Sequence, residues 1–259
     1  MTPVRLLTDD LGAAVAVPAD VRRVVSLVPS LTEALAESAP GLLVGATDWC
    51  SHPPDLAVTR VKGTKNPDVP AVVALRPDLV LANEEENRLV DLDALRAAGL
   101  AVWVTAPRAV PAGLVSLRRM LAACGAPDPG WLAEADEAWA RVPRVASGRR
   151  RRAVIPIWRR PWMVVGRDTF TGDVLARLGV DNLWAGAAER YPKVELDVLR
   201  AAGPDLVVLP DEPYAFSAQD GPEAFPGVPA ALVSGRHLTW YGPSLAQAPT
   251  VLTAQLDVG

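Results

Sequence analysis

Two short segments of this chain repeat one pattern, and that repeat limits the fold more than any other feature of the sequence. Residues 77–81 read Pro-Asp-Leu-Val-Leu, residues 204–208 read Pro-Asp-Leu-Val-Val, and acidic residues follow both. A short apolar run that begins after Pro and Asp is typical of a buried strand in a parallel sheet. Because the two segments stand at equivalent points of the two halves of the chain, the sequence predicts two similar lobes.

Apolar, strand-like segments alternate with helix-like segments along both halves, as expected for parallel strands that are connected by helical crossovers. A first helix should follow Pro29, since Ser30 and Glu33 have the spacing of a capping box. The expected strands are residues 23–27, 42–44, 78–82, 101–104, 153–158 and 205–209, and the other expected helices are residues 69–75, 89–98, 111–123, 171–178 and 194–202. We therefore predict an α/β fold with two Rossmann-like lobes, each with a central parallel sheet.

A single backbone helix is expected to join the lobes. In residues 128–142, Asp128 can cap a helix, Pro129 suits its first position, and apolar residues recur at helical spacing from Leu132 to Val142. The predicted organisation is an N-terminal α/β lobe, a linking backbone helix and a C-terminal α/β lobe, at residues 1–126, 127–147 and 148–259.

The charge of the chain argues against nucleic acid as a partner. The formal net charge is -4, which supplies no broad cationic field to attract a phosphate backbone. The one basic run, Arg149–Arg152, directly precedes an apolar strand-like segment and is read as the solvated entrance of that strand.

The N-terminus predicts a cytoplasmic protein. Asp9 and Asp10 stand where the apolar core of a secretory signal would begin, and the apolar residues that follow read better as the second arm of a hairpin that turns at residues 10–12. No segment approaches the ~20 apolar residues of a membrane-spanning helix, so membrane insertion is not expected. The two cysteines, Cys50 and Cys124, are too few for a disulfide framework, although one bridge stays open.

Aromatic residues gather in segments that follow the expected strands. In open parallel sheets, ligands bind beyond the carboxyl ends of the strands. Each ring taken alone reads as a cover for the core, but the set as a whole predicts an aromatic-lined ligand cleft. Its members are Trp49, Trp158, Trp162, Phe170, Tyr191, Tyr214, Phe216, Trp240 and Tyr241.

The segment from Asp48 to Pro54 contains both Cys50 and His52, which suggests a metal site or a nucleophile with its base. A metal site usually needs three or four ligands, and a nucleophilic pair needs an orienting group and an oxyanion hole. The sequence reveals neither set, so a packed thiol and a loop histidine are preferred.

Carboxylates follow both repeated strands, at Glu84, Glu85 and Glu86 in the first half and at Asp211 and Glu212 in the second. Paired carboxylates can act as acid and base in a glycoside hydrolase, so a hydrolase that uses these groups, or Cys50 with His52, is the alternative from another class. Solvated caps or acceptors for ligand amides are favoured instead. Dinucleotide, Walker and nucleophile-elbow motifs are absent from the sequence.

Five motifs carry a resemblance to a known family that covers nearly the whole chain from about residue 20. They are Arg-Arg-Val-Val-Ser-Leu-Val-Pro-Ser-Leu-Thr-Glu (22–33), Val-Gly-Ala-Thr-Asp-Trp-Cys-Ser-His-Pro-Pro (44–54), Lys-Gly-Thr-Lys-Asn-Pro (62–67), Val-Ala-Leu-Arg-Pro-Asp-Leu-Val-Leu-Ala (73–82) and Trp-Tyr-Gly-Pro (240–243). In order and spacing the chain resembles the cobalamin-binding protein of bacterial ABC importers. It is also similar to the wider helical-backbone metal receptor group, or class III periplasmic binding proteins, which includes siderophore and haem binders.

The resemblance implies a non-catalytic substrate-binding protein that holds a corrinoid such as cobalamin, or a related metal chelate, between two lobes. A ferric siderophore or haem is the alternative ligand, and no cofactor of its own is expected. The resemblance implies ligand contacts from Trp49, from the loop at residues 64–66 and from the loop at residues 240–241, and His52 is a candidate axial ligand to cobalt. The full set of expected ligand-binding residues is Trp49, Cys50, His52, Lys65, Asn66, Glu84, Glu85, Asn87, Trp158, Trp162, Phe170, Asp211, Glu212, Tyr214, Trp240 and Tyr241.

The family's ABC importers are docked by acidic residues at the lobe tips, and Pro70 stands at the corresponding first-lobe position. Together with the acidic N-terminus, this predicts a monomeric corrinoid-handling protein in the cytoplasm that does not deliver its ligand to an ABC importer. An extracytoplasmic location is the alternative if the N-terminus is incomplete.

Overall fold

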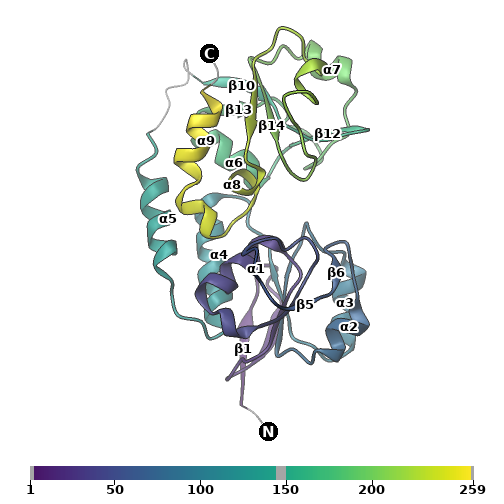
Figure 1. The fold of residues 1–259 in the computed structure, drawn as a ribbon, viewed down its shortest axis with the longest axis vertical. Coiled ribbons are helices and arrows are strands. Elements are labelled where there is room, and N and C mark those ends of the chain that lie inside the picture. The colour runs from purple at the N-terminus through teal and green to yellow at the C-terminus, as the bar shows by residue number, and fades with distance from the viewer. Residues whose placement is uncertain (1–2, 144–149, 258–259) are drawn as a thin grey trace. The chain divides into compact units, whose positions relative to one another are not determined.

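The structure is a computed structural model that describes residues 3–143 and 150–257 (Figure 1). The chain forms two compact units. The first comprises Met1–Pro107, Pro111–Ala133 and Tyr241–Pro243, and the second comprises Arg108–Val110, Glu134–Trp240 and Ser244–Gly259. Helix α5 (Gly130–Ala140) carries the chain from the first unit into the second, because the boundary after Ala133 falls within it. The lobe bounds expected from the sequence stay a prediction, and residues 144–147 of the expected linker lie outside the described residues.

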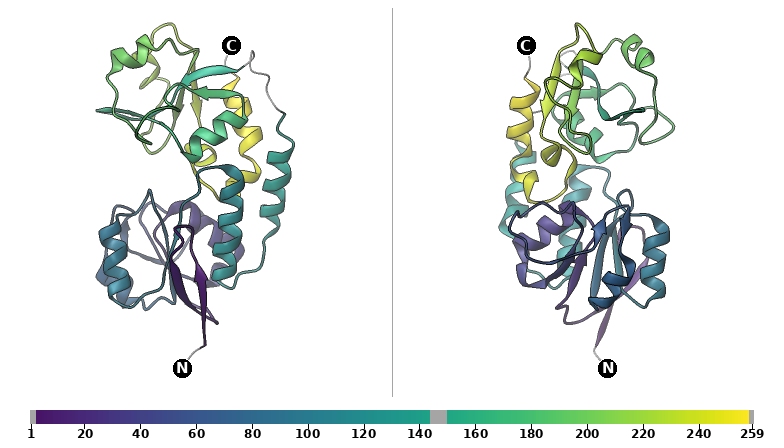
Figure 2. Two further views of the ribbon diagram at one scale, coloured as in Figure 1. Left: turned by 180° about the vertical axis from the view of Figure 1, so that it is seen from behind. Right: turned by 45° about the vertical axis from the view of Figure 1, so that its right-hand side comes forward.

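The first unit is built on a five-stranded parallel sheet in the order β5-β4-β3-β8-β9. Its strands are β3 (Val24–Ser26), β4 (Leu43–Ala46), β5 (Thr59–Arg60), β8 (Leu79–Asn83) and β9 (Val102–Thr105). Helices α2 (Val69–Ala74) and α3 (Leu89–Ala97) cover one face, and α1 (Pro29–Ser38) and α4 (Val110–Ala123) lie on the other (Figures 1 and 2). Buried aliphatic side chains such as Val25, Val80 and Leu95 fill the layer beneath α2 and α3.

The second unit has a four-stranded parallel sheet in the order β13-β10-β14-β15. Its strands are β10 (Arg151–Val154), β13 (Val180–Asn182), β14 (Leu206–Pro210) and β15 (Ala230–Val233), and its helices are α6 (Phe170–Arg177), α7 (Leu196–Ala201), α8 (Gly235–Thr239) and α9 (Ala248–Leu256). Helices α6, α8 and α9 lie on one side of the sheet and α7 on the other (Figure 1). Short 3-10 turns occur at Pro40–Leu42, Pro222–Ala224 and Pro243–Ala246. The predicted α/β fold with two parallel sheets is confirmed.

The repeated Pro-Asp-Leu-Val segments form equivalent central strands, β8 and β14. The carboxylate of Asp78 accepts hydrogen bonds from the backbone amides of Arg22 and Arg23, at 2.8 and 2.9 Å, and the Asp205 carboxylate accepts one from the amide of Arg152 at 2.9 Å. Each aspartate therefore ties its central strand to the start of the neighbouring strand. The sequence repeat thus has a structural cause in both sheets.

Three antiparallel hairpins complete the units. β1 (Val4–Thr8) pairs with β2 (Ala14–Pro18) across the turn expected at residues 10–12, where the Asp9 carboxylate accepts the amides of Leu11 and Ala13. β6 (Lys62–Gly63) pairs with β7 (Asn66–Pro67) in the first unit, and β11 (Pro156–Arg159) pairs with β12 (Trp162–Val164) in the second.

Three local predictions are wrong. Residues 153–158 do not form one strand: β10 ends at Val154, because Pro156 lacks the amide that would continue the ladder, and a hairpin begins there. Ser30 does not cap α1, since Pro29 takes its first position and Val28 is the N-cap. Helix α5 begins at Gly130, two residues beyond the expected Asp128 cap.

Within residues 3–143 and 150–257, no helix has the length and apolar character that crossing a bilayer requires.

Candidate functional site

Loops that follow strands of the first sheet meet at its carboxyl edge. They are residues 47–52 after β4, residues 84–88 after β8, and the β6–β7 hairpin. The backbone amide of Asp48 donates to Lys62 O at 2.8 Å, which fixes the first loop to the hairpin. The expected residues on these loops are Trp49, Cys50, His52, Lys65, Asn66, Glu84, Glu85 and Asn87.

The Cys50 loop is held by buried contacts. Thr32 Oγ1 and Thr47 Oγ1 lie 3.0 and 3.1 Å from the Cys50 sulfur, and the thiol is fully buried. The guanidinium of Arg60 donates to Thr47 O at 2.9 Å and to Cys50 O at 3.0 Å. Burial raises the pKa of the Cys50 thiol, the opposite of what an activated nucleophile needs. The geometry fits the packed thiol that the sequence favours.

Trp49 and His52 flank this thiol. Trp49 is 69% exposed, and a Cβ atom at Gly63 would lie 3.3 Å from its indole Nε1. The Nε1 edge of the indole therefore lies against the hairpin, while most of the side chain is exposed to solvent. The Nδ1 atom of His52 lies 3.1 Å from Ser51 Oγ. Among the described residues no cluster of three or more His, Cys, Asp or Glu side chains could hold a metal ion.

Two asparagines organise the loop after β8. The Asn87 side chain accepts the backbone amide of Asn83 at 2.9 Å and donates to Thr64 O at 2.9 Å and to Leu27 O at 3.3 Å. Asn83 Oδ1 accepts the amides of Glu85 and Glu86. The ammonium of Lys65 donates to Glu85 O, which ties the hairpin tip to the same loop.

Tyr241 also belongs to the first unit. Its hydroxyl accepts a hydrogen bond from Asn83 Nδ2 at 2.6 Å and lies 3.0 Å from Thr105 Oγ1. Burial raises the pKa of this phenol. Tyr241 is only 7% exposed. Its buried hydroxyl therefore holds the ends of β8 and β9 together.

An aromatic cluster stands at the carboxyl edge of the second sheet. The ring of Trp158 lies 5.6 Å from that of Tyr214 at an interplanar angle of 79°, and Tyr214 lies 4.6 Å from Phe216. Trp162 stacks on Phe216 at 6.2 Å and 11°. Trp158 is 43% exposed while Phe216 is buried, so the cluster reaches from the core to the surface.

The other expected residues of the second unit are more enclosed. Phe170 is buried at the start of α6, and Trp240 is buried at the end of α8. Asp211 is exposed after β14, and its carboxylate accepts the amide of Gly235 at 2.6 Å. A Cβ atom at Gly235 would collide with the side chain and backbone of Glu212, so only glycine lets α8 approach this loop.

The structure adds residues that the sequence reading missed. Arg60 holds the Cys50 loop, Asn83 organises the loop after β8, and Arg159 with Asp220 supports the aromatic cluster of the second unit. Asn83 could have been found, because an asparagine that ends a strand before a turn often caps the turn with its side chain. The arginine contacts depend on tertiary structure and leave no signal in the sequence.

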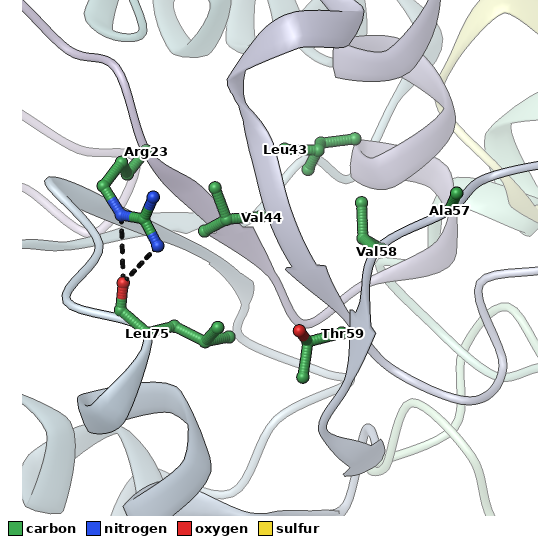
Figure 3. Close-up of a pocket in the computed structure, with 7 residues that line it drawn as sticks. All are labelled: Arg23, Leu43, Val44, Ala57, Val58, Thr59 and Leu75. Atoms are coloured by element: carbon green, nitrogen blue, oxygen red, sulfur yellow. Dashed lines mark hydrogen bonds between the residues drawn. The ribbon is translucent and has the colours of Figure 1, made fainter.

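One hollow of the first unit lies away from these loops. It has a volume of about 570 Å³ and is lined by Arg23, Leu43, Val44, Ala57, Val58, Thr59 and Leu75, residues near the amino ends of β3, β4 and β5 (Figure 3). The guanidinium of Arg23, its one charged group, makes two hydrogen bonds to Leu75 O. Because ligands bind at the carboxyl ends of parallel strands, we do not assign the ligand site to this hollow.

Curated relatives of the chain are vitamin B12-binding proteins. The protein of Pectobacterium carotovorum is 23% identical over 252 residues, covering 94% of this chain and 90% of the relative. The protein of Salmonella choleraesuis is 25% identical over 192 residues, covering 72% and 71%. No family model matches the chain.

Solved structures share the fold. CeuE of Helicobacter pylori with bound Ni(II) superposes with a TM-score of 0.82 at 13% identity, covering 98% of this chain and 89% of that chain. The periplasmic vitamin B12-binding protein BtuF of Vibrio cholerae gives 0.73 at 16%, covering 92% and 97%. The periplasmic haem-binding protein RhuT of Roseiflexus gives 0.72 at 23%, covering 91% and 98%.

These findings overturn the predicted location. The chain was expected in the cytoplasm because of its acidic N-terminus, but the vitamin B12-binding and haem-binding proteins that share its fold are periplasmic, so that prediction is wrong. The start of a given sequence is a weak guide to location. The predicted binding function, in contrast, fits the curated relatives named as vitamin B12-binding proteins and the solved structures named as vitamin B12-binding or haem-binding proteins. The curated relatives and the shared fold support the helical-backbone metal receptor family, which is the resemblance that the sequence motifs predict.

Proposed function

We propose that the chain is a non-catalytic, extracytoplasmic binding protein for a corrinoid of the cobalamin type. The observation that carries the proposal is one exposed indole at the carboxyl edge of each sheet, Trp49 in the first unit and Trp158 in the second. Exposed indoles on rigid supports offer large flat contacts to a macrocycle. The names of the curated relatives support the same class of ligand.

The charge at these edges favours a corrinoid over haem. Glu84 and Glu85 follow β8, and Asp211 and Glu212 follow β14, so both edges carry carboxylates. The side-chain amides of a corrinoid can donate hydrogen bonds to carboxylates, whereas the two propionates of haem would be repelled by them. Haem remains the second candidate, because haem-binding proteins share the fold.

The contacts at Cys50 support a binding role over an enzymatic one. The thiol is buried against Thr32 and Thr47 and has a raised pKa, so it cannot supply the hydrolytic nucleophile of the alternative reading.

An ABC importer is the partner that the family resemblance implies for an extracytoplasmic protein of this kind.

Fluorescence titration of single variants tests the proposal. Trp49→Leu and Trp158→Leu should each weaken binding of cyanocobalamin, while Trp131→Phe is the matched control because Trp131 donates to Ser38 Oγ at 3.2 Å and lies outside both edges. Equal affinity in all three variants would refute the assignment of these indoles.

A charge variant tests the choice of ligand. A carboxylate about 8 Å from a propionate repels it by ~0.5 kcal/mol in water, so Glu84→Gln with Glu85→Gln should improve haemin binding by several-fold. Cyanocobalamin binding should stay equal or weaken. An improvement for both ligands alike would contradict the charge argument.

A further inference from the structure

A charged network contacts the aromatic cluster of the second unit. Arg159 ends strand β11, one residue after Trp158, and its guanidinium contacts the carboxylates of both Asp220 and Glu223. The Arg159 side chain is only 17% exposed, whereas the two carboxylates are 41% and 50% exposed. The arginine is therefore enclosed and held by two anions.

The same network reaches the rings. The Tyr214 hydroxyl donates to Asp220 Oδ2 at 2.6 Å, while Asp220 Oδ1 faces Arg159. The Asp220 carboxylate thus bridges the guanidinium and the phenol. Arg159 also lies over the Trp162 ring, with 5.5 Å from Cζ to the ring centroid. Charge-assisted hydrogen bonds of this kind are stronger and more directional than neutral ones.

The loop that carries Asp220 is itself fixed. The backbones of Ser217 and Asp220 exchange hydrogen bonds at 3.0 and 3.2 Å, and the Glu223 carboxylate accepts the amide of Gly221 at 2.6 Å. The Gly221 amide lowers the pKa of Glu223, with a further contribution from Arg159, so this carboxylate is charged at neutral pH. The bridging aspartate therefore has a defined position relative to the tyrosine.

We propose that Arg159 and Asp220 are positioning residues, which hold the Tyr214 ring so that Trp158 stands against it at a right angle. Trp158 is 43% exposed and its edge-to-face contact at 5.6 Å joins it to a ring that is tied down by its hydroxyl. A side chain that is already held in one rotamer loses less conformational entropy when a ligand binds. Preorganisation of this kind therefore increases the affinity for the ligand. This inference rests on the proposed function only where it concerns ligand binding.

The experiment has one readout without ligand and one with it. The Trp158 signal is the difference in near-ultraviolet circular dichroism between a protein and the same protein with Trp158→Phe. This difference should be lost when it is measured in Arg159→Met, and it should be strongly reduced in Tyr214→Phe. Asp220→Asn should retain more of the signal than Asp220→Ala, because an amide oxygen can still accept the tyrosine hydroxyl.

The control is Arg152→Met, which removes a more exposed ion pair to Asp205 at the start of β10, away from the aromatic cluster. This variant should keep the Trp158 signal although it also loses an arginine. In Arg159→Met the affinity for cyanocobalamin should fall about tenfold relative to this control, which corresponds to ~1.4 kcal/mol.

The two readouts separate the two proposals. An unchanged Trp158 signal in a folded Arg159→Met protein would overturn the positioning inference, whatever the ligand. Loss of the signal together with a wild type that retains no chelate would support the positioning of Trp158 and would refute the proposed function. Loss of the signal with unchanged affinity would show that the network orients the rings, and it would overturn the part of the inference that links this orientation to ligand affinity.

Discussion

Replacing Asn87 by alanine should loosen the candidate site of the first unit more than any change of an exposed residue there. The Asn87 side chain is 5% exposed and makes hydrogen bonds to Asn83 N, Thr64 O and Leu27 O. Each such bond contributes about 1 kcal/mol net, and a buried amide left without its acceptor costs more, so the loss should be about 3 kcal/mol. The β6–β7 hairpin should lose its buried tie to the loop after β8 and keep only the contact from Lys65 to Glu85 O.

Urea unfolding followed by circular dichroism measures the loss of stability, and hydrogen exchange of residues 62–67 measures the release of the hairpin. Glu84→Ala is the matched control, since Glu84 is exposed on the same loop and its replacement should change stability by less than ~0.5 kcal/mol. A loss below about 1 kcal/mol for Asn87→Ala, or unchanged exchange in the hairpin, would refute the view that Asn87 holds these loops together.

Two further predictions concern thiol reactivity and acid stability. Burial raises the pKa of Cys50 and raises that of Cys124 to about 12. At pH 8 the native protein should therefore resist Ellman's reagent, while both thiols of the unfolded chain should react with it. Rapid labelling of the native protein would contradict this prediction. The backbone amide and then the side chain of Arg152 lower the pKa of Asp205, so its stabilising effect is complete above the ordinary aspartate pKa of ~3.9 and is lost as the pH falls through the lower folded value. The urea midpoint of Asp205→Asn should therefore lie below that of the wild type at pH 6, and the difference should shrink as the pH is lowered through the acid range. A constant difference would exclude this linkage.

The sheets were predictable because their central strands, β8 and β14, are buried on both faces. Segments such as residues 79–83 and 206–210 are continuous apolar runs, and Pro and Asp mark where they begin. The hairpin at residues 156–164 was missed, because the apolar run continues through Val154, Ile155 and Ile157 while the ladder ends at Pro156. Apolar pattern alone cannot reveal where a backbone amide is lacking in a strand.

The places of the candidate residues in the fold were predictable, and the contacts that hold them were less so. The rule that ligands meet the carboxyl ends of parallel strands selected Trp49, Trp158 and Tyr214, which the structure places on loops and hairpins at those edges. The contacts of Asn87 with Leu27 and of Arg159 with Asp220 join residues 60 and 61 positions apart. Such pairs arise from tertiary packing, so one sequence does not reveal them.

Retention of ligand after desalting tests the central claim most directly. Purified protein is incubated separately with cyanocobalamin, haemin and a ferric siderophore, passed through a desalting column, and its visible absorbance is recorded. The proposed function predicts that cyanocobalamin is retained at one molecule per chain and that haemin is retained more weakly. Retention of haemin or the siderophore in preference to cyanocobalamin, or of none of the three at micromolar protein, would contradict it.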